Sequence, residues 1–175
     1  MQNRYIMTAF GKDRPGIVAD VTQVLYENGC NLEDTTMSML SEEFTINLLF
    51  SANDDNIEAT LLERCRNLEQ QKNISAFIRP LQERRVTNQG TLPTCTLHIE
   101  GMDQAGIVYK ISKFLSENQI NIESLTTKKS FSPHYGSATY QMEMEVLMPD
   151  TVSLDDAEKG LSQIENDLNV DITIS

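Results

Sequence analysis

The sequence predicts an α+β protein made of two copies of one βαββαβ unit, each an antiparallel sheet with both helices on one face. Three observations predict this fold. The second half repeats the first at an offset of 90 residues. Each copy alternates between the period of two that is typical of a strand and the period near 3.6 that is typical of a helix. A Gly-x-Asp-x-x-Gly turn opens the first helix of both copies.

The repeat is clearest around that turn. Gly11-Lys-Asp-Arg-Pro-Gly-Ile-Val aligns with Gly101-Met-Asp-Gln-Ala-Gly-Ile-Val, and the match continues without a gap. Eleven of the 27 positions from 11 to 37 are identical to their counterparts. A fixed-period match of this density indicates duplication of one folded unit.

The first copy contains the six expected elements in order. After a β-rich first segment, an apolar stripe at helical spacing predicts a helix with a buried face. A hairpin around Ser41-Glu42, a second amphipathic helix and a last strand follow. The predicted strands are 5–10, 31–40, 43–51 and 74–81, the second helix is 56–72, and the core stripe of the first helix is Ile17, Val18, Val21, Val24 and Leu25.

The second copy repeats this order. Its core stripe is Ile107, Val108, Ile111, Phe114 and Leu115, its strands are 95–99, 122–129, 136–148 and 170–174, and its second helix is 154–168. A longer loop, 130–136, replaces the tight turn of the first copy, and its role is not predicted. We expect domains at 1–82 and 94–175, joined by a polar linker at 83–93. The element order and packing of each domain are those of a ferredoxin-like fold.

The ends of the first helices carry typical boundary residues. Asp13 and Asp103 lie where a carboxylate could cap a helix start, and Pro15 is expected in the first turn, which tolerates proline. Asn28-Gly29 is a usual helix end. Asn118 has no glycine after it, so we expect that helix to end through the asparagine.

Charge and composition limit the function. Fourteen Lys and Arg against 26 Asp and Glu give a net charge of −12, which opposes binding to nucleic-acid phosphates. No apolar stretch could span a bilayer, and no signal peptide is recognised, so we expect a cytoplasmic protein. The three cysteines, at 30, 65 and 95, lack metal or redox spacing and are expected to be reduced and mostly buried.

The sequence gives little support to catalysis. It contains no P-loop, Rossmann fingerprint or zinc-binding helix motif. His98 and His134 have no evident catalytic partner, and the alternating Met142, Met144 and Met148 indicate a core or domain interface. We therefore expect a non-catalytic protein without a metal or cofactor.

The repeated segments resemble the ACT domains, small ligand-sensing modules. Asp13-Arg-Pro-Gly-Ile-Val with Asn31-Leu-Glu downstream is similar to the ACT pattern, and Asp103-Gln-Ala-Gly-Ile-Val with Asn121-Ile-Glu repeats it. The resemblance covers nearly the whole chain. Two such domains with nothing attached, the Ser-Pro-His-Tyr-Gly loop and the segment from Met142 to Pro149 resemble the glycine cleavage system transcriptional repressor family.

The resemblance implies an amino-acid site, with glycine as the ligand by family analogy, at the turn between the first strand and the first helix, usually at an interface with another ACT domain. Helix-start N–H groups suit a ligand carboxylate, and glycine allows close approach. The candidate ligand-binding residues are Asp13, Arg14, Pro15, Gly16 and Ile17, with Asn31 nearby, and Asp103, Gln104, Ala105, Gly106 and Ile107, with Asn121 nearby. The resemblance also implies action through a transcriptional activator protein, without direct DNA binding. We expect a homo-oligomer.

Several alternatives stay open at this point. Asp13 and Asp103 are interpreted either as helix caps or as ligand contacts, and Arg14 either as a ligand or partner contact or as an ordinary surface cation. Gln104-Ala105 replaces Arg14-Pro15, so the two turns need not bind the same molecule. As a whole, the chain is an amino-acid-sensing regulator, a ligand-independent scaffold, or a regulatory fragment of an enzyme such as a formyltetrahydrofolate deformylase.

Overall fold

The computed structural model describes residues 3–54, 56–81, 93–132 and 137–175. The chain divides into two compact units, Met1–Arg85 and Val86–Ser175. Within the predicted linker, 83–93, only Pro93 belongs to the described residues. The domain boundaries at 82 and 94 therefore stay a prediction.

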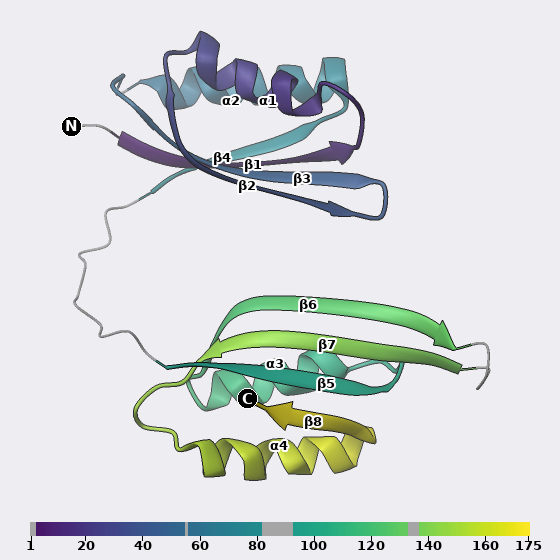
Figure 1. Cartoon of the computed structure of the whole chain (residues 1–175). Coiled ribbons are helices and arrows are strands. Elements are labelled where there is room, and N and C mark those ends of the chain that lie inside the picture. The colour runs from purple at the N-terminus through teal and green to yellow at the C-terminus, as the bar shows by residue number, and fades with distance from the viewer. Residues whose placement is uncertain (1–2, 55, 82–92, 133–136) are drawn as a thin grey trace. The chain divides into compact units, whose positions relative to one another are not determined.

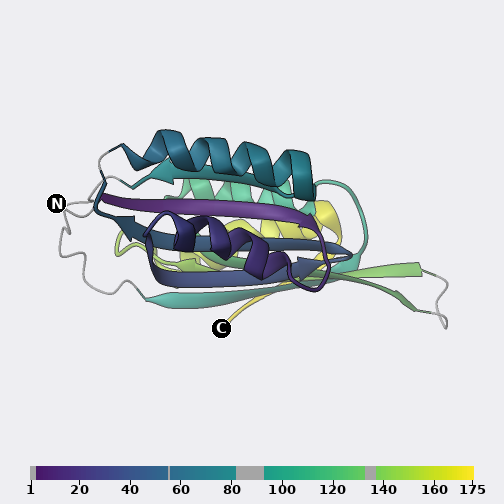
Figure 2. The same ribbon diagram turned by 90° about the horizontal axis from the view of Figure 1, so that it is seen from above.

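The first unit is a four-stranded antiparallel sheet with both helices on one face (Figures 1 and 2). The spatial order of the strands is β2-β3-β1-β4, so the first strand lies in the interior of the sheet. The elements are β1 (Asn3–Lys12), α1 (Ile17–Glu27), β2 (Asn31–Leu40), β3 (Glu43–Ala52), α2 (Ile57–Lys72) and β4 (Ser75–Pro80).

The second unit has the same topology, with strand order β6-β7-β5-β8. Its helices also share one face of the sheet (Figure 1). The elements are β5 (Thr94–Met102), α3 (Ile107–Glu117), β6 (Asn121–Ser132), β7 (Ser137–Leu147), α4 (Leu154–Leu168) and β8 (Val170–Ile174). The predicted fold class and the order of all the elements are confirmed.

Each unit has its own hydrophobic core between the sheet and its helices. Alternate residues of the inner strands point into it, including Met142 and Met144, so the predicted methionine series belongs to the core. The helical stripes are buried as predicted except at Val18 in the first copy and at Val108 and the partly buried Phe114 in the second. Val18 is 40% exposed and Val108 is 37% exposed, because the residue directly after the buried helix start lies on the outer side of the helix.

The first hairpin has the predicted turn, whereas the second is longer than the sequence indicated. β2 and β3 turn at Ser41, which adopts a left-handed φ of 57°. In the second unit the strand pairing continues to Ser132 and Ser137. Residues 130–132, which were predicted as loop, therefore belong to β6. Its remainder, 133–136, lies outside the described residues.

Helix ends show two departures from the predictions. The caps of α1 and α3 are Gly16 and Gly106, with no side-chain cap, so Asp13 and Asp103 do not cap these helices. Pro15 precedes the cap and lies outside the first turn of α1. After α3 the left-handed residue is Gln119, with φ 59°, where the first copy has Gly29. Asn118 is the C-cap of α3, as expected, and its side chain donates to the Phe114 carbonyl oxygen at 2.8 Å, as Asn28 donates to the Val24 carbonyl oxygen in the first copy.

One helix contact differs between the units. In the second unit, Phe114 of α3 packs against α4 at Gly160, where an added Cβ would overlap the aromatic ring. Val24 holds the equivalent place on α1 and is buried without such a glycine. Gly160 therefore accommodates the larger side chain. None of the helices in the described residues is long and apolar enough to cross a membrane.

Candidate functional site

In the first unit, the turn from β1 to α1 is an exposed loop above a buried helix start. The Asp13 N–H donates to the Glu42 carbonyl oxygen at 2.9 Å, which fixes the turn to the β2–β3 hairpin. Asp13, Pro15 and Gly16 are exposed, whereas the Ile17 side chain belongs to the core. Ile17 can therefore present only its backbone to a ligand, as can Ile107 in the second unit.

The two glycines of the motif have different roles. Gly16 has a φ of 89° and Gly106 a φ of 99°, a left-handed conformation that side chains disfavour. Gly11 and Gly101 lie inside strands, where they allow close packing. A Cβ at Gly101 would lie 2.7 Å from Val170 Cγ1, and one at Gly11 would lie 2.9 Å from the Asn73 carbonyl oxygen.

Arg14 is engaged within the protein. Its Nη2 lies 2.5 Å from Asp20 Oδ2, and Lys72 Nζ lies 3.5 Å from the other carboxylate oxygen. The Arg14 hydrogen bond lowers the pKa of the Asp20 carboxyl, and Lys72 adds to the effect. These contacts tie the β1–α1 turn to the body of α1 and to the last residue of α2.

The second unit ties its turn to the same place by different chemistry. Gln104, at the position equivalent to Arg14, donates to the Leu168 carbonyl oxygen at the end of α4. Lys110 holds the position of Asp20, and its Nζ lies 3.9 Å from Asp167 Oδ2. The residue after the motif aspartate therefore has a structural role in both copies.

The two motif aspartates differ in their surroundings. Asp103 forms an ion pair with Lys129 of β6. Met39 holds the matching position in the first copy, and within the described residues Asp13 has no cationic partner. An exposed carboxylate beside the positive end of a helix dipole can bind an ammonium group while the helix start binds a carboxylate. The β1–α1 turn of the first unit thus offers a partner for both the ammonium group and the carboxylate of a free amino acid.

Asn31 and Asn121 lie away from these turns. Asn31 pairs with Ser51, which pairs with Arg4, whereas the turn follows Lys12 at the other end of β1. Eight residues of a strand correspond to about 27 Å. Asn121 pairs with Leu147, which pairs with Thr94, at the equivalent end of β5. The prediction that the asparagines lie near the turns is wrong within one unit, because each helix returns the chain to the far end of the sheet.

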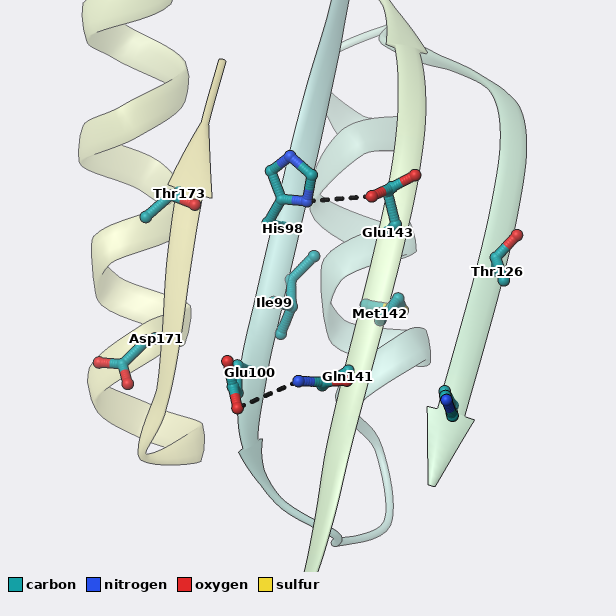
Figure 3. Close-up of a pocket in the computed structure, with 10 residues that line it drawn as sticks. His98, Ile99, Glu100, Thr126, Gln141, Met142, Glu143, Asp171 and Thr173 are labelled. Carbon is teal, nitrogen blue, oxygen red and sulfur yellow. Dashed lines mark hydrogen bonds and ion pairs between the residues drawn. The ribbon is translucent and has the colours of Figure 1, made fainter. Parts of the chain in front are cut away.

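A groove of about 490 Å³ lies elsewhere, on the face of the second sheet that is opposite its helices (Figure 3). His98 Nδ1 lies 3.2 Å from Glu143 Oε2, and Gln141 donates to Glu100 at 3.2 Å. His98, for which the sequence showed no evident partner, therefore contacts Glu143, whereas His134 lies outside the described residues. The other lining residues are Ile99, Thr126, Lys128, Met142, Asp171 and Thr173.

The thiols and the acidic side chains form no metal site within the part of the chain that the structure describes. All three cysteines are free. Cys65 is buried, and its burial raises the pKa of the thiol to about 11. Cys30 and Cys95 are only half-buried, less than the sequence indicated.

Comparison with known proteins finds relatives of the first unit and of the whole chain. The ACT domain model matches residues 3–77. The glycine cleavage system transcriptional repressor of Escherichia coli K12 is 25% identical over 99% of this chain and 90% of its own length. The first unit therefore matches the ACT domain family, and the chain is similar over nearly its whole length to this repressor.

Solved structures support the fold of the whole tandem ACT chain. An unknown protein from Galdieria sulphuraria has a TM-score of 0.78 with 24% identity and covers 100% of this chain and 98% of its own. A structure provisionally named as a glycine cleavage system transcriptional repressor has a TM-score of 0.69 with 23% identity, covering 100% and 97%. At these identities the two structures show the fold alone.

Sequence reasoning missed the groove and the ion-paired turn of the second ACT unit. Alternation along β5 and β7 could have placed His98, Glu100, Gln141 and Glu143 on one face, because i and i+2 share a face of a strand. The Lys129–Asp103 pair depends on the register of β6 with β7, which no local pattern specifies.

Proposed function

We propose that this protein is a non-catalytic cytoplasmic regulator that binds an amino acid at the β1–α1 turn of its first unit. It acts on transcription through a protein partner, a transcriptional activator, and not by binding DNA. The name of its Escherichia coli relative refers to the glycine cleavage system, so glycine is the first amino acid to test.

The turn of the first unit carries the ligand part of the proposal. The first turn of a helix presents N–H groups without intrahelical partners, and Gly16 places no side chain over them. The exposed Asp13 carboxylate supplies the opposite charge at the same turn. In the second unit Lys129 neutralises the equivalent carboxylate, so we propose that the second turn does not bind the same ligand.

The net charge supports action through a protein. At −12 the chain repels the phosphate backbone that supplies non-specific DNA affinity. Ligand binding can change the affinity for the partner only as far as the ligand binds the partner-bound and the partner-free protein with different affinities, typically by about 1–3 kcal/mol.

Calorimetry with full-length protein and glycine, alanine, serine and other amino acids tests the site. We expect heat with at least one of them. Asp13→Asn should weaken that binding about tenfold or more, because it removes a charge-assisted contact to the ammonium group. The matched variant Asp103→Asn should leave affinity unchanged. Absence of heat with every amino acid, or equal effects of the two variants, would contradict the proposed site.

A ligand-independent scaffold is the second candidate. One observation favours it: Arg14 and Gln104 are already engaged within their own units and are not available to a ligand. Under this alternative, capture of the activator by the immobilised full chain would be the same with and without amino acids. A change of capture by one amino acid would favour the sensing function.

A further inference from the structure

The two sheets differ on the face opposite their helices, which we call the open face. In the first unit this face carries Ile6, Phe10, Leu49 and Phe77. Phe10 is 42% exposed and Phe77 is 63% exposed, and their rings stack with centroids 6.1 Å apart. Large apolar groups on an exposed sheet face indicate a surface that is covered by another protein.

The second unit is an internal control for this reading. In the second unit, the cross-strand pair Thr96 and Glu145 takes the place of Ile6 and Leu49. Glu100 takes the place of Phe10, and Thr173 takes the place of Phe77. All four apolar positions are therefore polar or charged on the second open face. The second unit has the same fold with a polar open face, so the fold itself does not require the apolar residues.

We propose that the open face of the first unit binds the same face of a second copy of this chain, sheet on sheet, with a two-fold axis along the strands. Two sheets pack this way with their strands within about 30° of each other. This inference goes beyond the proposed function and holds whether or not an amino acid binds.

The distribution of charge selects this partner and this axis. One row across the sheet reads Asp34, Leu49, Ile6, Arg79 from edge to edge. A two-fold axis along the strands keeps the row and reverses its order. Asp34 then faces Arg79 of the second copy, and Leu49 faces its Ile6.

A second row agrees. Glu43 of β3 pairs with Lys12 of β1. The same axis places Glu43 opposite Lys12 of the second copy, and Lys12 opposite Glu43 of the second copy. Lys12 also lies 3.5 Å from Glu42 within its own chain. An axis across the strands through the middle of this face, at Thr8, would instead place Lys12 over Arg4 of the second copy, which brings two cations together. Arg4 is already paired with Glu33 on this face.

The size of the face predicts a weak dimer. From Arg4 to Lys12, four strands span about 27 Å by about 19 Å. The interface would bury on the order of 1,000 Å² in total, at the lower limit for a specific complex. We therefore expect a dissociation constant in the micromolar range.

Sedimentation velocity of the full chain from about 1 µM to about 200 µM measures this association. We expect a monomer–dimer equilibrium. Phe10→Glu with Phe77→Thr copies the residues of the second unit and should weaken the dimer at least tenfold, with an unchanged circular dichroism spectrum. A chain that stays monomeric throughout the range would overturn the proposal.

Two further sets of variants keep the outcome decisive. Asp34→Arg and Arg79→Asp should each weaken the dimer, and together they should restore it, which loss of folding cannot imitate. Met37→Thr with Met39→Lys copies the second unit at the exposed edge strand β2 and should leave the dimer intact. A dimer that dissociates with the edge variants but resists Phe10→Glu with Phe77→Thr would show edge pairing and overturn the proposal.

Discussion

Asp20 shares its carboxylate between two cations of the first unit, Arg14 and Lys72. No local pattern predicts this arrangement, because the residues come from a turn and two helices. The sequence left Arg14 open as a ligand or partner contact or as an ordinary surface cation, and the structure places its guanidinium in an internal ion pair. A residue type can suggest a chemistry, but its partner depends on tertiary packing.

Asp20→Asn should lower the free energy of unfolding at pH 7 by about 0.5 kcal/mol, because the pair is partly exposed. The pKa of Asp20 is lowered in the folded state, so its stabilisation is present above the unfolded pKa, about 3.9, and is lost as the pH falls further. Urea unfolding at pH 7 and at about pH 2.5 measures both values. The difference between wild type and variant should disappear at the lower pH.

Asp167→Asn is the matched control in the second unit. Its carboxylate is 73% exposed and lies 3.9 Å from Lys110, so its removal should change stability little at either pH. An acid-independent cost of Asp20→Asn would mean that packing, not charge, accounts for the effect.

At the scale of the element, periodicity predicted the strands and helices well. The apolar residues of a stripe all lie on the one face that packs into the core, so their spacing indicates the type of element. The Gly11 and Gly101 positions show where such reasoning stops. The sequence suggests turn glycines, yet both lie in strands, against residues that follow the second helix of their unit. Close approach between elements has no signature in local sequence.

The contact of α3 with α4 gives a prediction at this scale. Gly160→Ala should destabilise the protein by about 1–2 kcal/mol, because overlap with Phe114 exceeds the gain in helix propensity. Adding Phe114→Val, the residue type of the first copy, should remove most of this cost. Thermal unfolding of the two single variants and the double variant measures the coupling. Additive effects would show that the two helices do not meet at Gly160.

At the scale of the whole molecule, the repeat predicted two similar units, and each unit closes its own core. The buried cluster of the first contains residues from Tyr5 to Ile74, and that of the second from Leu97 to Val170. Neither cluster includes a residue of the other unit. The fold of each unit was readable from sequence, but the unequal surfaces of the two copies were not, because exposure depends on strand order.

Separate cores predict separate folding. The fragments 1–85 and 86–175, expressed individually, should each show cooperative thermal unfolding by circular dichroism. A fragment of this size is near the lower end of independent stability, so lower melting temperatures than in the full chain are expected. A fragment that is unfolded at low temperature would show that one unit needs the other.

Closed cores also have a genetic consequence. We expect a substitution that unfolds one unit to leave the other intact, so that two defective alleles can be made, each damaged in a different half of the gene. Coexpression of the two then distinguishes two modes of action. Restored regulation would show that the halves can work from different chains, and continued failure would show that they must be joined in one.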